Sequence, residues 1–246
     1  MIAASDHRPW PLPRGPWVMA QSWHDLLFAH WPVPVEHLRP ALPSFLPLDT
    51  FAGRAWVGVI PFRMTGVRLR GIPPVPWLSA FPELNVRTYV TAGGKPGVFF
   101  FSLDAGNAVA VTVARRWFRL PYYRARMSVT PDQGGIRYTS QRVHRGAAPA
   151  AFSARYAPVG PVFRASAGSL DRWLTERYCL YTTGPAGRLY RAEIHHAPWP
   201  LQRAAAAVLR STMTGPLGIA LPDAEPLLHF ARRLDVVVWA PRPVAG

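Results

Sequence analysis

The chain has 246 residues, 49% of them hydrophobic and 17% charged, which supplies a core and excludes an intrinsically disordered protein. Its 28 lysines and arginines outnumber 13 acidic residues, and the formal net charge of +15 favours anionic partners. Lys95 is the only lysine, however, so the excess of arginine beside alanine, glycine and proline is better explained by a GC-rich genome and a solvated surface than by anion recognition.

Proline punctuates the first third of the chain and predicts short elements separated by turns. Residues 1–16 are predicted to be an extended, proline-rich arm, and a mixed apolar stretch follows over 17–31. Pro34 stands at an early helical position before a helical turn that ends at Pro43. Residues 54–72 contain β-rich runs, so a mainly β chain is indicated from here on.

Two hairpins are predicted in the middle of the chain. The first spans 84–105 with AGGKPG as its turn, and the second spans 126–143 around PDQGG. Between them, residues 108–118 are ambiguous: alternating valines favour a strand, whereas the alanines and an arginine pair permit a helix.

The C-terminal part is predicted to mix short helices and strands. Ser169 is a candidate N-cap of a short helix, and 187–196 alternates like a strand. The alanine-rich run 200–213, with proline at its start, is the best helix candidate, and a buried strand is expected within 227–240. We expect one mainly β domain over 17–246.

Cysteine usage and hydropathy indicate the compartment. Cys179 is the only cysteine, so an intramolecular disulfide is excluded and the reducing cytoplasm fits; in its apolar setting we expect a buried, inert thiol. The N-terminus has no apolar segment of signal-peptide length, and no window offers the about 18 apolar residues of a spanning helix. We therefore expect a cytoplasmic protein without a membrane span.

Several common site motifs are missing from the sequence. There is no phosphate-binding glycine loop and no GxSxG elbow. His195 and His196 are adjacent on a predicted strand and point to opposite faces, and His24 and His30 lack helical spacing. No metal site and no cofactor are predicted.

Two carboxylates stand out because the chain has few. Glu83 lies in FPELNVRTYV, and Arg87 falls on the same face if that strand is regular. One interpretation is a Glu–Arg pair at a sheet edge; the other is a general acid/base, or a group that orients substrate, in a cavity. Asp104, at the end of an apolar strand, is predicted to cap a turn.

The segment RRWFRLPYYRARM, residues 115–127, concentrates five arginines and four aromatic residues. A basic face with stacking aromatics is typical of nucleic-acid binding. Arginines that alternate with apolar side chains are equally typical of a half-buried strand.

Several blocks of the sequence resemble a known family. They are WHDLLFAHWPVP, GRAWVGVIPFRM, FPELNVRTYV, FFSLDA, LTERYCLYT and EIHHAPWPLQ, spread over about residues 17–240. In this order they resemble the YqjF-like or DUF2071 family of uncharacterised bacterial proteins. That family is distantly similar to the acetoacetate decarboxylase-like superfamily, which implies an antiparallel β-barrel or cone with a few short helices and an interior cavity.

The resemblance also implies site residues. FPELNV is similar to the decarboxylase segment that brings a glutamate into the cavity, which makes Glu83 its counterpart. The decarboxylase lysine pair, whose first member forms the Schiff base, is replaced here by Tyr122 and Tyr123. Schiff-base chemistry needs a primary amine, and Lys95 lies in a turn that we expect to be exposed. Lysine-dependent decarboxylation is therefore rejected.

These residues lead to three hypotheses. The first is a cavity that binds a small carbonyl- or carboxylate-bearing molecule, with lysine-independent acid/base chemistry at Glu83 and Tyr122 and with Arg87, Arg116 and Tyr123 as ligand contacts. Strand alternation lets only one tyrosine face inward, and the resemblance favours Tyr122. The second is a non-catalytic carrier or sensor with the same cavity, and the third an arginine-rich nucleic-acid binder. Nucleic acid is the less favoured partner, and a homo-oligomer stays open.

Overall fold

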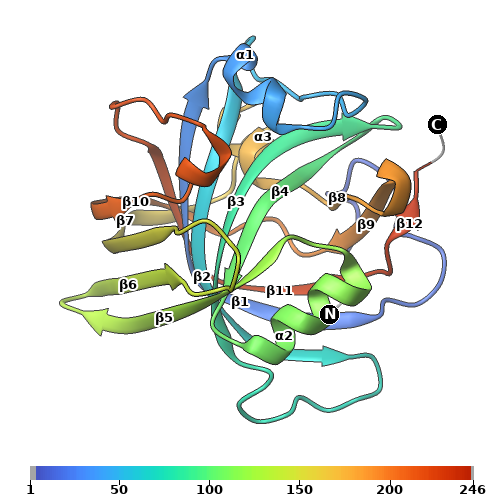
Figure 1. The fold of residues 1–246 in the computed structure, drawn as a ribbon, viewed down its shortest axis with the longest axis horizontal. Coiled ribbons are helices and arrows are strands. Elements are labelled where there is room, and N and C mark those ends of the chain that lie inside the picture. Colours follow the sequence, from blue (N-terminus) through green and yellow to red (C-terminus); the bar gives the residue numbers. More distant parts are fainter. Residues whose placement is uncertain (1–3, 245–246) are drawn as a thin grey trace.

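The computed structural model describes residues 4–244 as a mainly β protein (Figure 1). Residues 4–18 form no regular element and run along the surface before the first strand. The strands are β1 (Met19–Val33), β2 (Ala55–Leu69), β3 (Phe81–Ala92), β4 (Lys95–Ala105), β5 (Tyr122–Asp132), β6 (Gly135–Arg142), β7 (Ala151–Phe163), β8 (Cys179–Thr183), β9 (Leu189–His195), β10 (Leu201–Ser211), β11 (Leu227–Val238) and β12 (Arg242–Pro243).

Helices are few and short, as the proline content predicts. The α-helices are α1 (Val35–Leu38), α2 (Ala108–Val113) and α3 (Leu170–Thr175), and the single turns are η1 (Arg39–Ala41), η2 (Ala114–Phe118), η3 (Pro185–Gly187) and η4 (Gly215–Leu217). None of the helices in the described part combines the length and apolarity needed to cross a bilayer.

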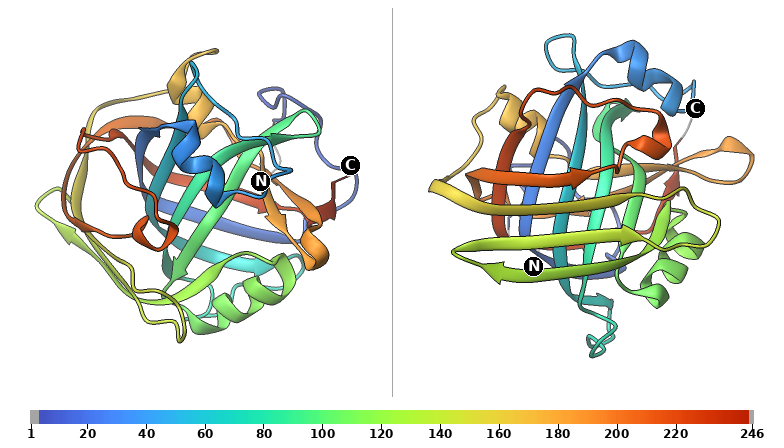
Figure 2. Two further views of the ribbon diagram at one scale, coloured as in Figure 1. Left: turned by 45° about the horizontal axis from the view of Figure 1, so that its top comes forward. Right: turned by 60° about the vertical axis from the view of Figure 1, so that its left-hand side comes forward.

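The strands form one curled sheet in the order β12-β9-β8-β4-β3-β2-β1-β11-β10-β7-β6-β5. Two further pairings close the sheet on itself: β5, the last strand of this order, also pairs with β4, and β9, the second strand, also pairs with β11. Figure 2 shows the strands wrapping around an interior. Neighbouring strands are antiparallel except β4–β5 and β4–β8, which are parallel. The expected antiparallel arrangement therefore holds apart from two pairings that both involve β4.

Both predicted hairpins are confirmed. β3 and β4 pair up to Ala92 and Lys95 around Gly93 and Gly94, whose φ values of +57° and +68° are those of a tight turn that glycine adopts without strain. β5 and β6 form the second hairpin and pair up to Asp132 and Gly135. The short helix after Ser169 is also confirmed, because the Ser169 side chain accepts a hydrogen bond from the backbone of Arg172.

One open alternative is resolved and one predicted element type is wrong. Of the two alternatives for residues 108–118, the structure shows the helix, because the Asn107 side chain accepts hydrogen bonds from Val109 N and Ala110 N at 3.0 Å and starts α2. The alanine-rich run 200–213 is mostly strand β10, paired with β7 and β11. Helix propensity is a weak preference, and pairing with β7 along the strand and with β11 at Gln202 and Arg203 overrides it.

The faces of β3 explain how the interior is divided. Leu84, Val86 and Val90 pack into one hydrophobic cluster with β1, β6 and β7. Alternate residues of β3 point the other way, among them Phe81 and Tyr89, which belong to a second cluster with β2 and β9. The cavity lies on this second side, and its position is therefore set by the pleat of β3.

Candidate functional site

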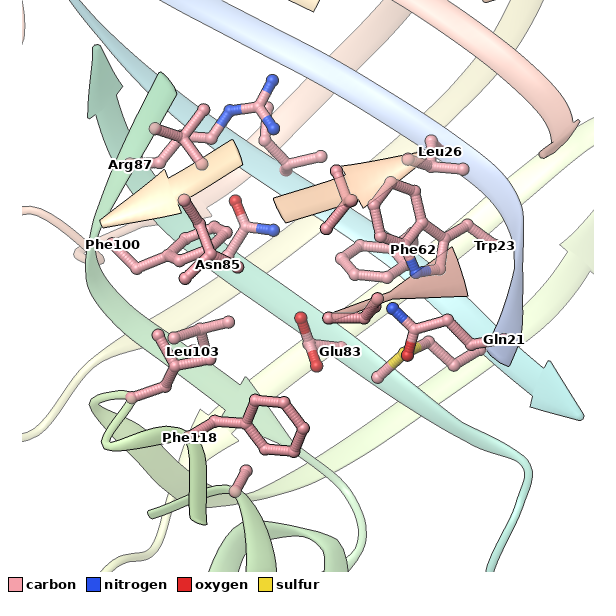
Figure 3. A pocket seen from close by; sticks show the side chains of 18 of the residues that line it. Gln21, Trp23, Leu26, Phe62, Glu83, Asn85, Arg87, Phe100, Leu103 and Phe118 are labelled. Carbon is pink, nitrogen blue, oxygen red and sulfur yellow. The ribbon is translucent and has the colours of Figure 1, made fainter. Parts of the chain in front are cut away.

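The second hydrophobic cluster encloses a cavity of about 170 Å³ (Figure 3). Apolar side chains form most of its wall, and α2 with η2 contributes to one side. A cavity of roughly 150 Å³ accommodates a benzene-sized molecule, so this one has room for a small monocyclic compound or a short acid. The polar side chains that line it are Gln21, Glu83, Asn85, Arg87, Tyr122, Thr175, Arg177 and His196.

Three of these polar groups come from successive inward positions of β3. Glu83, Asn85 and Arg87 follow one another along the strand, as Figure 3 shows. With a rise of about 3.3 Å per residue, the Cα atoms of Glu83 and Arg87 are roughly 13 Å apart. The shared face is thus confirmed, but the Glu–Arg pair at a sheet edge is wrong: β3 lies between β2 and β4, and no ion pair joins the two side chains.

Glu83 forms the acidic end of the cavity. Its side chain is buried, with 3% of the residue exposed, and Oε2 accepts a hydrogen bond of 2.7 Å from the Tyr122 hydroxyl. Desolvation raises the pKa of Glu83 to about 8, aided by the charge of Asp104 and opposed by the Tyr122 hydrogen bond. At neutral pH the carboxyl group is therefore mostly protonated and can donate a hydrogen bond into the cavity.

The two adjacent tyrosines face opposite sides of β5, as alternation requires. Tyr122 lines the cavity, and burial together with the neighbouring Glu83 raises its pKa well above 10. Tyr123 lies in a separate depression, with the Arg142 guanidinium 4.1 Å from the centre of its ring. The structure therefore places Tyr122, and not Tyr123, beside Glu83.

Arg116 also lies outside the cavity. It is exposed on the outer side of η2, because this segment is helical and directs only some of its side chains inward. Of the three expected ligand contacts, only Arg87 lines the cavity.

Arg87 forms the basic end of the cavity. Its Nη2 donates to the Tyr89 hydroxyl and to the backbone oxygen of Leu174, both at 3.3 Å, and its Nε has no partner. Among the described residues no carboxylate lies within ion-pair distance of Arg87, whereas the neighbouring Arg177 is paired with Asp49 at 2.7 Å. A buried guanidinium without a counter-ion is chemically able to pair with a carboxylate.

Other polar atoms around the cavity also lack partners. Within residues 4–244, five residues that line the cavity have a buried atom without a partner, namely Trp23 Nε1, Asn85 Oδ1, Arg87 Nε, Arg177 Nη2 and Trp199 Nε1. Each such group costs roughly 1–3 kcal/mol when it is left unpaired, so a polar ligand that bonded several of them would recover that free energy. The wall therefore presents mostly donors.

Sequence reasoning missed several of these residues. Asn85 had a signal, since it stands two positions after Glu83 on the same face of the strand. Arg177, Trp23 and Trp199 had none, because they come from segments that only the folded sheet brings together.

His196 completes the lining at the side of β9. Its Nδ1 lies 2.8 Å from the backbone oxygen of Ala197, and burial lowers the pKa of His196, so the ring is neutral. His195 points away from the cavity toward His7 of the N-terminal arm, 5.6 Å between ring centres. In the described part of the chain, no group of three or more histidine, cysteine or acidic residues is placed to hold a metal ion.

Three further expectations about single residues are settled by their contacts. Asp104 does not cap a turn: it is fully buried and accepts hydrogen bonds of 2.7–3.1 Å from Arg142, since the end of β4 lies inside the fold. Lys95 is not freely exposed, because its Nζ lies 2.7 Å from Glu193 and its side chain is 26% exposed. Cys179 is buried, and desolvation raises the pKa of its thiol to about 12, as expected of an inert cysteine.

Solved structures define the class of this fold. Acetoacetate decarboxylase from Legionella pneumophila matches with a TM-score of 0.64 at 12% identity over 98% of this chain and 93% of that one. The enduracididine biosynthesis enzyme MppR, in complex with pyruvate, matches with a TM-score of 0.64 at 13% identity over the same shares. The protein thus has the fold of acetoacetate decarboxylase, built around a cavity with one acidic and one basic end.

Sequence comparison places the chain more closely. The model of the DUF2071 family, described as an uncharacterised conserved protein, matches residues 20–235. YqjF of Bacillus subtilis, described as uncharacterised, is 50% identical over 228 residues, which cover 93% of each chain. The protein belongs to the DUF2071 family.

Proposed function

We propose that the protein binds a small organic acid with a carbonyl group and acts on it by acid/base chemistry that needs no lysine. The proposal rests on one observation: a single small cavity contains both a protonated carboxyl group at Glu83 and, at its other end, a guanidinium without a carboxylate partner at Arg87. The carbonyl oxygen of the ligand accepts the proton of Glu83, and its carboxylate faces Arg87 at the other end of the cavity, whose positive charge attracts it. Closure of the strands into the barrel or cone of the decarboxylase fold would limit the cavity to single water molecules that exchange with solvent.

The chemistry follows from the protonation states. Glu83 gives its proton to the carbonyl oxygen while water takes a proton from the neighbouring carbon, so that the keto form becomes the enol. The hydrogen bond from Tyr122 stabilises the Glu83 carboxylate formed in this step, and a proton from solvent restores the acid. The reverse reaction returns a solvent proton to carbon.

Pyruvate is the first ligand to test. MppR, which shares the fold, has been solved in complex with pyruvate, and pyruvate is small enough for this cavity. We propose the same class of 2-oxo acid here because the donors that line the cavity suit a carboxylate and a ketone.

Deuterium exchange tests the proposal directly. The methyl signal of pyruvate in deuterated water is followed by proton NMR with the parent protein and with Glu83→Gln. We expect the parent protein to exchange the methyl protons faster than buffer does. Glu83→Gln should lower this catalysed exchange rate by about 100-fold, the usual scale of general acid catalysis. Binding without exchange would identify a non-catalytic carrier or sensor. If neither pyruvate nor other small oxo acids bind, the proposal is overturned.

A further inference from the structure

A second depression lies on the opposite side of the Tyr122–Tyr123 segment. Its volume is about 410 Å³, and the basic side chains around it come from η2, β6 and the loop after β6. They are Arg115, Arg142, His144 and Arg145, and they surround Tyr123. We call this depression the arginine pocket.

The positive charge of the arginine pocket is only partly compensated. The Asp104 carboxylate forms an ion pair with Arg142 and neutralises the charge of that guanidinium group. Arg115 donates to the backbone oxygen of Tyr122 at 2.7 Å, and neither Arg115 nor Arg145 has a carboxylate within ion-pair distance in the described chain. Two guanidinium charges therefore remain for a ligand.

Two other groups show that the pocket is more than a charged surface. Ser102 is 3% exposed and lines the pocket, yet its hydroxyl has no hydrogen-bond partner among the described residues. The His144 ring lies edge-on to Tyr123 with 5.5 Å between ring centres. Desolvation, then the charges of Arg115 and Arg142, lower the pKa of His144, so the ring stays neutral and able to hydrogen-bond.

The far wall of the pocket is apolar. Phe101, Met213 and Leu217 line it, and an adjoining depression beyond Tyr123 continues along Phe99 and Pro121. A ligand with a compact anionic group and an apolar body would fit this division.

We propose that the arginine pocket binds the phosphate group of a small phosphate monoester, with Arg115 and Arg145 as its main contacts. A monoester is close to a dianion at neutral pH and so balances both free guanidinium groups. Arginine binds phosphate in bidentate geometry, and the Ser102 hydroxyl supplies a further donor. A phosphodiester carries one charge per phosphate and matches this local balance less well.

Calorimetric titration of the full chain tests the site with inorganic phosphate and phenyl phosphate. We expect phenyl phosphate to bind more tightly, and Arg115→Met and Arg145→Met each to weaken binding about tenfold, the scale of one lost charge-assisted contact. Arg116→Met is the matched control, since Arg116 is exposed beside Arg115 but does not line the pocket. It should bind like the parent.

Three outcomes would overturn the proposal. Equal weakening by Arg116→Met would mean unspecific charge attraction, and absence of binding of both phosphates would mean no site. A short single-stranded DNA that binds more tightly than phenyl phosphate, with a steep salt dependence, would instead identify a nucleic-acid surface. Arg115→Met also removes the hydrogen bond to Tyr122, whereas Arg145→Met leaves that bond in place and so tests the pocket independently of it. Thermal unfolding of every variant verifies that it is folded.

Discussion

The Tyr122 hydroxyl lies 2.7 Å from Oε2 of Glu83, although 39 residues separate them in the sequence. Strand β4 brings them together: Glu83 of β3 is opposite Ala105, and Tyr122 of β5 is opposite Leu103. Because β4–β5 is a parallel pairing, the chain must pass through α2 and η2 before it returns, and this crossover also forms one side of the cavity. One topological feature thus supplies both the hydrogen bond and part of the enclosure.

Glu83 should make the stability of the protein fall as the pH rises. Its pKa is about 8 in the folded protein and 4.5 in a model compound, so the folded state holds a proton that the unfolded chain releases between these values. The free energy of unfolding should therefore decrease across this window, by at most about 5 kcal/mol, and level off above it. Urea unfolding of the parent and Glu83→Gln at several pH values measures the difference.

The variant should equal the parent near pH 4.5 and exceed it at pH 8 and above. Glu36→Gln, at an exposed glutamate, is the control and should show no such divergence. Parallel pH profiles of the parent and Glu83→Gln would contradict the raised pKa.

Removal of the Tyr122 hydroxyl should raise the pKa of Glu83 further, because the hydrogen bond from Tyr122 favours the charged carboxylate. We expect Tyr122→Phe to lose about 1 kcal/mol of stability and to shift the Glu83 titration upward. Carbon NMR of labelled glutamate follows the carboxyl signal directly. Tyr123→Phe should leave this titration unchanged, and an equal shift in both variants would refute the assignment of Tyr122 to the cavity.

Arg87 should contribute to ligand affinity but not to stability. Replacement of a buried cation that has no carboxylate partner removes a desolvated charge, so Arg87→Met is expected to unfold at the same or a higher temperature. Affinity for pyruvate should fall about tenfold, since the attraction of the Arg87 charge for the ligand carboxylate is lost. Calorimetry of Arg87→Met beside Arg116→Met checks this, and an equal effect of both substitutions would exclude Arg87 as a specific contact.

Two exposed alanines of β10 test whether this segment is a strand and not the helix that its sequence predicts. Ala205 and Ala207 lie on its outer side, opposite Ala157 and Arg155 of β7. Substitution of either by threonine should raise stability by roughly 0.5 kcal/mol in a strand, whereas it would lower stability in a helix. Chemical unfolding decides the sign, and a loss of stability in both variants would contradict the strand.

Local patterns in the sequence determined part of this protein. The hairpin turns at Gly93 and in PDQGG follow from residues that tolerate positive φ, and the buried Cys179 follows from its apolar neighbours. The shared face of Glu83 and Arg87 follows from the pleat alone. The family resemblance predicted the mainly β fold and the inward position of Tyr122. The cytoplasmic location and the division into an N-terminal arm and one domain stay predictions.

Only the tertiary structure decided the rest, because it depends on partners far away in the chain. The run 200–213 is a strand since β7 pairs with it along most of its length and β11 pairs with its start, which no local propensity can reveal. Asp104 was assigned to a turn because Arg142, its partner 38 residues on, is invisible at short range. The charge balance of the site has the same origin: whether Arg87 meets a carboxylate depends on packing between strands and not on spacing within one.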